Sequence, residues 1–303
     1  MTAGSTGGAG GGPRVVAVGG GHGLAASISA VRRYAGDVTA IVSVADDGGS
    51  SGRLREALGI SPPGDLRRCL VAMGDPDSLW ARAFEHRFDA GELEGHSLGN
   101  VVIAGLSATT GDFLAALEEA ARLVGVGPGG RVLPATAHPV VLEAEGESGT
   151  VRGQLAVATG TAAGRIKRVS ILPADAGTPP AALAAVAEAD QVVVGPGSLF
   201  TSVLAALAAP ELARAVAASR AWRVYVCNLG PQEPETAGYD AAGHVEALLA
   251  HGVEIDVVLC DHTFPPPPDG RLPVPVVTAD VARDDGRGHD PARLAAALEN
   301  LLG

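Results

Sequence analysis

The sequence has few aromatic residues, few cysteines and only one lysine. Only 3% of the 303 residues are aromatic, so small apolar side chains must fill the interior. This composition suits helices packed closely on a parallel sheet. Cys69, Cys227 and Cys260 form no CxxC pair, which excludes a disulfide framework and a zinc-binding pattern and leaves buried thiols. Arginine replaces lysine everywhere except at Lys167, and this bias predicts no function.

Basic charge and long apolar runs are also scarce. The formal net charge is -12 and the pI is about 5.1, which argues against nucleic acid or an anionic membrane as a partner. No apolar window reaches the length of a membrane span. Residues 1–13 lack the basic and apolar segments of a signal peptide, so we expect a disordered tail there. We expect residues 14–303 to form one α/β domain of a cytoplasmic protein.

One stretch concentrates the polar chemistry of the chain. The apolar, β-branched run Val38 to Val44 predicts a buried parallel strand, and the sequence ADDGGSSGRLR, from Ala45 to Arg55, follows it. Carboxylates can hold a hard cation or a ribose hydroxyl, glycines allow close backbone approach, and arginines pair with phosphate. The stretch predicts a polyphosphate site. The alternative is a polar turn before a capped helix. The candidate residues are Asp46, Asp47, Gly48, Gly49, Ser50, Ser51 and Arg53, with Asp46 and Asp47 as metal ligands.

Two further glycine-rich turns follow predicted strands. Gly19 to Gly23 follows the strand Arg14 to Val18 and precedes a helix from Leu24, while Gly195 to Ser202 follows the strand Gln191 to Val194. Amide donors and the helix dipole favour an anion at such helix starts. The first turn is not a full GxGxxG. Asp46 lies 23 residues beyond Gly23, a spacing that suits the ribose-binding acid of a nucleotide fold.

Two other segments place polar groups at predicted helix starts. Asp65 opens a helix with Leu66, Leu70 and Met73 on one face; Arg67 and Arg68 fall on other faces, where a solvated surface remains an alternative to a phosphate contact. His96, Ser97 and Asn100 precede an apolar helix over residues 101–107. A capping or core histidine is the alternative for His96. We identify no nucleophile with a base and an orienting group, because the serines and histidines lie on these loops.

The pattern changes between residues 131 and 173. Apolar and polar residues alternate there, with turn signals at residues 147–149, which predicts short antiparallel strands inserted into the main fold. We expect this insertion to form a flap or a dimer surface without phosphate contacts, and we expect a homo-oligomer. Elsewhere, strands alternate with helices. The predicted fold is therefore α/β, a three-layer α/β/α Rossmann-like parallel sheet with a small antiparallel insertion.

The assembled turns resemble the YvcK family of gluconeogenesis factors, within the superfamily of CofD, the 2-phospho-L-lactate transferase. The matching stretches run in order from Val15 to about His251: VVAVGGGHGL, TAIVSVADDGGSSGRLR, PPGDLRRCLVAM, EGHSLGNVVIAGL, GRVLPAT, GPGSLFTSV and VYVCNL. One departure is His22, which stands where the family usually has threonine and so removes a phosphate-facing hydroxyl.

The resemblance implies a Rossmann-type sheet and a nucleotide-sugar ligand such as UDP-glucose or UDP-N-acetylglucosamine. It also implies a role in carbon metabolism, cell-wall synthesis and cell shape. The positions that it implies for ligand binding, beyond the candidates above, are Gly20, Gly21, His22, Gly23, His96, Ser97, Asn100, Gly195, Gly197, Ser198, Thr201 and Asn228.

Three functions remain open at this point. The first is a nucleotide-sugar-binding regulator without turnover. The second is a CofD-like transferase in which Asp46 or Asp47 holds Mg²⁺ across a diphosphate while arginines neutralise the leaving group. The third is an NAD-dependent oxidoreductase, which is weaker because the first loop lacks the full fingerprint. No cofactor is certain: Mg²⁺ belongs to the transferase alternative and NAD to the oxidoreductase.

Overall fold

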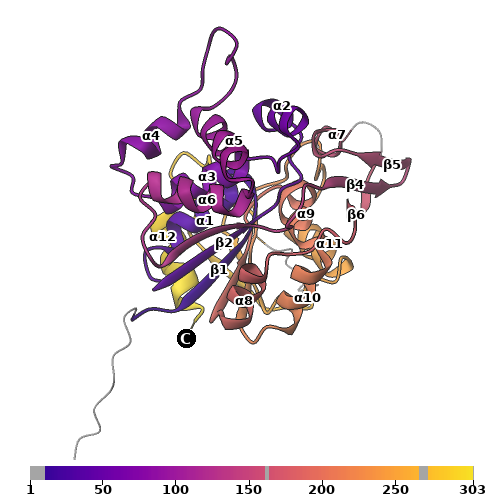
Figure 1. The fold of residues 1–303 in the computed structure, drawn as a ribbon. Helices are drawn as coiled ribbons and strands as arrows, with labels where there is room; N and C mark the ends of the chain where they lie inside the picture. Colours follow the sequence, from indigo (N-terminus) through magenta and orange to yellow (C-terminus); the bar gives the residue numbers. More distant parts are fainter. Residues whose placement is uncertain (1–10, 161–163, 266–271, 303) are drawn as a thin grey trace, which may run out of the picture.

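A parallel sheet forms the centre of the protein (Figure 1). The structure, a computed structural model, describes residues 11–160, 164–265 and 272–302. The first ten residues of the predicted tail lie outside the described residues. So do three of the four consecutive prolines at 265–268, a run that predicts a loop. The seven strands of the sheet follow the order β10-β9-β8-β7-β1-β2-β3, and every pair is parallel. They are β1 (Arg14–Gly19), β2 (Asp37–Val42), β3 (Gly130–Pro134), β7 (Gln191–Val194), β8 (Trp222–Val226), β9 (Val257–Asp261) and β10 (Val276–Ala279).

Helices cover both faces of this sheet, which confirms the predicted three-layer α/β/α fold. One layer contains α1 (Gly21–Val31), α3 (Gly64–Met73), α5 (Leu98–Thr110), α6 (Phe113–Leu123) and α12 (Pro291–Asn300). The other contains α8 (Pro180–Glu188), α9 (Leu204–Leu207), α10 (Pro210–Ala218) and α11 (Ala241–Ala250). The central strands are buried almost completely, as their β-branched runs predict.

The strand order reverses between β1 and β7. From β1 the chain moves outward through β2 to β3, and after the insertion it returns to β7 and moves the other way to β10. Such a reversal opens a crevice at the carboxyl ends of the two central strands, where ligands of doubly wound sheets bind. All three predicted glycine turns follow adjacent parallel strands, β7, β1 and β2, and therefore lie at this one edge.

The segment from residue 131 to 173 differs in part from the prediction. Its first strand, β3, pairs in parallel with β2 and belongs to the main sheet. The antiparallel sheet contains only β4 (Val141–Gly146), β5 (Gly149–Arg152) and β6 (Ile166–Leu172), and a short helix, α7 (Gln154–Ala158), interrupts it. The alternation of apolar and polar residues could not distinguish the two sheets. β3 is an edge strand with one exposed face, and so it has the same pattern as the strands of the insertion.

Helix starts also differ from the prediction at two glycine-containing turns. α1 begins at Gly21, three residues before the expected Leu24, and α5 begins at Leu98 instead of Val101. α2 (Gly49–Leu58) likewise begins inside the glycine stretch, and α4 (Leu79–Glu85) starts after its cap Ser78. The polar turn residues are therefore parts of the first helical turns, which brings their backbone N–H groups to the edge of the sheet.

Among the described helices, none alone has the length and apolar character needed to cross a membrane. The bent pair formed by residues 199–207 and 210–218 passes that test only when its two parts are taken together. Residues 199–207 are almost entirely buried in the protein core.

Candidate functional site

Three adjoining cavities lie along the carboxyl edge of the strands. The first, of about 890 Å³, lies over the loops that follow β1 and β7. The second, of about 340 Å³, lies between the starts of α2 and α3. Gly21 and Ser202 line both. A third cavity, of about 760 Å³, shares Gly49, Ser50 and Arg87 with the second. We call these the large, central and outer cavities, and refer to the three neighbouring cavities together as the cleft.

The first glycine loop forms the floor of the large cavity. Gly21 has a φ of +64° and starts α1, a backbone conformation that favours glycine. A Cβ at Gly23 would overlap the carbonyl oxygen of Pro196, so the loops after β1 and β7 touch here. His22 lies on the same loop and lines the cavity. Gly20, Gly21, His22 and Gly23 therefore lie together, as predicted from the sequence.

Asn228 holds the third glycine loop in place. Its Oδ1 accepts a hydrogen bond from the backbone N–H of Gly197 at 3.0 Å, and its Nδ2 donates to the Gly197 carbonyl at 2.9 Å. Gly197, Ser198 and Asn228 line the large cavity, while Gly195, with a φ of +78°, turns the chain away from β7 just beneath it. Asn228 thus fixes the conformation of this loop and also forms part of the cavity wall.

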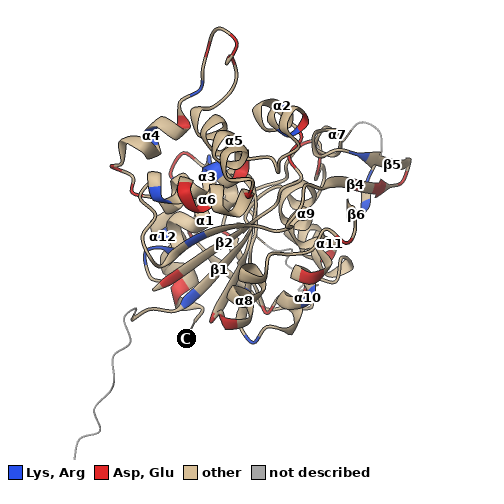
Figure 2. Cartoon of the chain, in the orientation of Figure 1, with Lys and Arg blue, Asp and Glu red and all other residues tan. Residues whose placement is uncertain are grey.

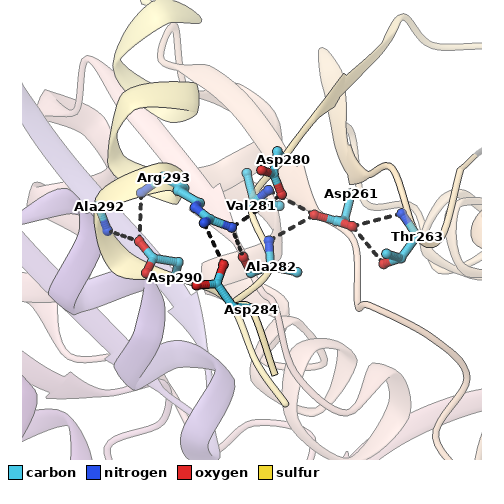
Figure 3. Close-up of polar contacts among 9 residues, drawn as sticks. All are labelled: Asp261, Thr263, Asp280, Val281, Ala282, Asp284, Asp290, Ala292 and Arg293. Atoms are coloured by element: carbon cyan, nitrogen blue, oxygen red, sulfur yellow. Dashed lines mark hydrogen bonds and ion pairs between the residues drawn. The ribbon is translucent and has the colours of Figure 1, made fainter. Parts of the chain in front are cut away.

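A loop between β10 and α12 forms the opposite wall, and sequence reasoning did not predict it. Arg283, Arg287 and His289 of this loop line the large cavity. The buried carboxylate of Asp261, at the end of β9, accepts hydrogen bonds from the backbone N–H groups of Val281 and Ala282, at 2.8 Å each (Figure 3). It also accepts two from Thr263.

These contacts change the pKa of Asp261 and support the loop. Burial raises the pKa of this carboxyl, but the four hydrogen bonds outweigh it and lower the pKa to about 2. At the far end of the loop, Arg293 donates to the Ala282 carbonyl and pairs with Asp284, and Asp290 caps α12 (Figure 3). The cavity wall therefore depends on a carboxylate that lies outside every predicted motif.

The two neighbouring acids of the central stretch have different roles in the structure. Asp46 lines the central cavity and accepts a hydrogen bond from the backbone N–H of Gly48 at 3.0 Å. Asp47 instead accepts hydrogen bonds from the backbone N–H groups of Gln154 and Leu155, at 3.0 and 2.8 Å, at the start of α7. The insertion is thus tied to the acidic turn, and Gln154 itself lines the central cavity.

Arg53 lies apart from Asp46. It is exposed, lines the outer cavity and donates to the Glu94 carbonyl at 2.8 Å. Arg55 and Arg87 line the same outer cavity. Asp47 and Arg53 both line the outer cavity, whereas Asp46 lines the adjoining central cavity. The three residues expected around one site are therefore divided between two neighbouring cavities.

The motif PPGDLRR supplies groups that the predicted site left out. Asp65 lines the central cavity with Asp46, and its carboxylate accepts a hydrogen bond from Arg68 at 2.7 Å. Burial, and then repulsion by Asp46, raise the pKa of Asp65, while Arg68 opposes them. A Cβ at Gly64 would overlap the Ser51 hydroxyl, which accepts a hydrogen bond from the Gly64 N–H. The signal in the sequence was the Gly-Asp-Leu-Arg-Arg run directly after two prolines.

Arg67 is only 2% exposed and not on the solvated surface that remained an alternative. Its Nε donates to Oδ1 of Asn100 at 3.1 Å, and it pairs with Glu85. Asn100 lines the central cavity, and its Nδ2 donates to Oγ of Ser50 at 3.0 Å. Ser50 in turn lies 2.9 Å from Nδ1 of His96. The structure therefore brings together three residues from the two predicted motifs.

Four predicted site residues do not line the three cavities: His96, Ser97, Gly195 and Thr201. Ser97 is fully buried, and its hydroxyl has no hydrogen-bond partner among the described residues. Thr201 donates its hydroxyl to the Glu235 carboxylate at 2.7 Å, and the backbone N–H groups of Phe200 and Thr201 donate to the same carboxylate. Glu235 therefore occupies the helix start at which the sequence predicted a ligand anion.

The cleft is basic although the chain is acidic. Its arginines outnumber its carboxylates (Figure 2 shows the basic segment of α3 that contributes two of them). Across residues 11–160, 164–265 and 272–302, no group of three or more His, Cys, Asp or Glu residues is arranged to hold a metal ion by itself. The arginines are Arg53, Arg55, Arg67, Arg68, Arg87, Arg283 and Arg287, and the carboxylates are Asp46, Asp47, Glu56 and Asp65.

The doubly wound sheet and the cleft at its switch point place the chain among the Rossmann-type α/β/α proteins, the class in which ligands bind at this edge. The family described as 2-phospho-L-lactate transferase CofD matches residues 15–272. The chain belongs to this family, within its branch of gluconeogenesis factors (YvcK, UPF0052).

Individual relatives agree with this assignment. The gluconeogenesis factor of Bacillus subtilis is 44% identical over 241 residues, which cover 79% of this chain and 75% of that protein. A Mycobacterium tuberculosis relative is 43% identical over 312 residues, covering 95% and 90%. The crystal structure of a UPF0052 family member from Bacillus halodurans has a TM-score of 0.88 at 36% identity, covering 95% of this chain and 99% of that one.

Proposed function

We propose that this protein binds a nucleotide sugar of the UDP-glucose or UDP-N-acetylglucosamine type. In this role it regulates carbon metabolism, cell-wall synthesis and cell shape in the cytoplasm, as a homo-oligomer without turnover. The observation that carries the proposal is the junction of the large and central cavities at Gly21 and Ser202, over the start of α1. A helix start that faces a cavity favours a phosphate group.

The cleft suits the two halves of such a ligand. The large cavity has room for a nucleoside and offers polar groups from the β1, β7 and C-terminal loops. The central cavity continues from it toward Arg67, Arg68 and Asn100, which suit phosphate and sugar oxygens. The basic character of the cleft in a chain of net charge -12 supports an anionic ligand.

A calorimetric titration with a ligand panel tests the proposal. UDP-glucose and UDP-N-acetylglucosamine should bind more tightly than GDP or NAD and should raise the melting temperature in proportion to affinity. Arg287→Ala, on the exposed rim of the large cavity, should weaken binding about ten-fold by removing a charge-assisted contact. Arg214→Ala is the matched control, because this exposed arginine lines a separate cavity of about 250 Å³. Binding of NAD alone would instead support the oxidoreductase.

A second function, a Mg²⁺-dependent transferase, is favoured by one observation. Asp46 and Asp65 present two carboxylates to the central cavity, beside the proposed position of the diphosphate. Mg²⁺ typically binds through one or two carboxylates together with substrate phosphates, so a third protein ligand is not required. The description of the family as a transferase supports the same idea. Release of a nucleotide from a UDP-sugar that depends on Mg²⁺ and on an added acceptor would establish it.

A further inference from the structure

A chain of hydrogen bonds runs from buried Arg67 through Asn100 and Ser50 to His96. The chemistry of its first member determines which group donates and which accepts in each bond. Arg67 can only donate, so Oδ1 of Asn100 accepts from it. This leaves Nδ2 of Asn100 facing Ser50, to which it donates at 3.0 Å. Because the Ser50 oxygen accepts this bond, its own hydrogen is available for Nδ1 of His96, 2.9 Å away.

His96 is in the right state to accept that hydrogen. Partial burial, and then the nearby Arg53 and Arg87, lower the pKa of its imidazole. The ring is therefore neutral at pH 7, with Nδ1 unprotonated when Ser50 donates to it. A serine hydroxyl held between an amide donor and a neutral imidazole has the geometry of an activated nucleophile with its general base.

The surroundings of Ser50 suit a phosphorus electrophile. Ser50 lies where the central and outer cavities meet, in the first turn of α2. Among the described residues, no side chain accepts a hydrogen bond from the backbone N–H groups of residues 49–51. These amides, with Arg68 and Arg87 on the same cavity wall, can stabilise the charge of phosphoryl oxygens during attack.

We propose that Ser50 is a nucleophile toward a phosphoric anhydride and that His96 is its proton acceptor. In this step the Ser50 oxygen bonds to phosphorus, and the bridging P–O bond breaks. The leaving phosphate takes the bonding electron pair, and the hydroxyl proton passes to Nδ1 of His96. Asn100 and Arg67 are positioning residues. The step cleaves one anhydride for each Ser50 and is a single covalent event, so it does not require turnover. Only the identity of the anhydride, a nucleotide sugar, rests on the proposed function; the reactivity of Ser50 does not.

Diisopropyl fluorophosphate tests the reactivity directly, because its phosphorus loses fluoride to an activated serine. Mass spectrometry of the treated protein should find one adduct, on the peptide that contains Ser50, and none there in Ser50→Ala. His96→Asn should slow labelling about hundred-fold, the typical contribution of a general base. His86→Asn is the matched control, since this exposed histidine on the same loop is outside the chain of hydrogen bonds, and it should label at the wild-type rate.

The absence of an adduct, an adduct only on other residues, or an unchanged rate in both His96→Asn and His96→Gln would overturn the proposal. Melting temperatures of all variants exclude unfolding as the cause of a loss. A titration with UDP-glucose separates the two ideas. Labelling of Ser50 without UDP-sugar binding would support the nucleophile and contradict the proposed ligand. Binding of UDP-glucose without labelling would support the ligand and contradict the nucleophile.

Discussion

The two halves of the carboxyl edge use their carboxylates differently. In the half after β7 and β9, Glu235 and Asp261 accept hydrogen bonds from backbone N–H groups and so close the loops on themselves. In the half after β1 and β2, Asp46 accepts one backbone hydrogen bond, from Gly48, but both Asp46 and Asp65 line the central cavity, and no side chain caps the first turn of α2. We call these the closed half and the open half.

The difference shows that similar motifs do not predict similar sites. The stretches GGSSGR and GPGSLFTS both combine glycines and hydroxyls at a helix start. One start remains open to the cleft, while the other is satisfied by Glu235, which lies 34 residues beyond Thr201 in sequence. Whether a helix start can bind an anion therefore depends on whether a side chain from elsewhere in the chain already accepts hydrogen bonds from its N–H groups. Only the tertiary structure decides this.

The largest effect should come from the closed half. The pKa of Asp261 is about 2, against about 3.9 in an unfolded chain. Asp261→Asn should therefore cost about 2.5 kcal/mol of unfolding free energy at pH 7. Because the pKa is lowered on folding, this contribution is present above about pH 4 and is lost as the pH falls toward 2. Urea denaturation from pH 7 to pH 2 measures both.

Asp280→Asn is the control for this prediction. Its side chain is 71% exposed and reaches Arg293 at 3.4 Å, so its loss should cost about 0.5 kcal/mol or less. Equal losses in the two variants would mean that Asp261 is not a specific support of the loop.

Asp46 tests the open half. Asp46→Asn should weaken UDP-sugar binding about ten- to hundred-fold with Mg²⁺ present, since it removes a charge-assisted contact, and should have little effect with a chelator. The melting temperature of the free protein should not fall, because Asp46 repels the carboxylate of Asp65. Calorimetry with and without Mg²⁺ checks this. An equal loss in both conditions would indicate a ribose contact, and no loss in either would place Asp46 outside the site.

The smallest effect should come from Asp47, which follows β2 but accepts hydrogen bonds from backbone N–H groups of the insertion. Asp47→Ala removes the acceptor for the first N–H groups of α7 and should cost about 1 kcal/mol, as other helix caps do. UDP-sugar affinity should stay within two-fold of wild type. Thermal melts and titrations on the same preparation decide the point, and a large loss of affinity with unchanged stability would move Asp47 into the ligand site.

Much of the fold followed from local patterns. The β-branched runs predicted the central strands, and the bounds of β7 agree with the prediction residue for residue. The prediction for the segment around β3 was wrong, because a half-exposed parallel edge strand shows the same alternation of buried and exposed residues as an antiparallel strand. The predicted glycine loops after β1 and β2 line the candidate cleft, but the predicted site did not include Asp65, Arg287 and Asp261.

The sequence by itself determined the class of fold, the edge at which the polar loops meet and the family, because these depend on the hydrophobic period and on contiguous motifs. Only the tertiary structure decided which polar groups remain available. Ser50 and His96 are 46 residues apart and lie 2.9 Å from each other, whereas Asp46 and Asp47 are adjacent and face different partners. Hydrogen-bond satisfaction depends on distance in space, and the packing of the helices on the sheet sets that distance.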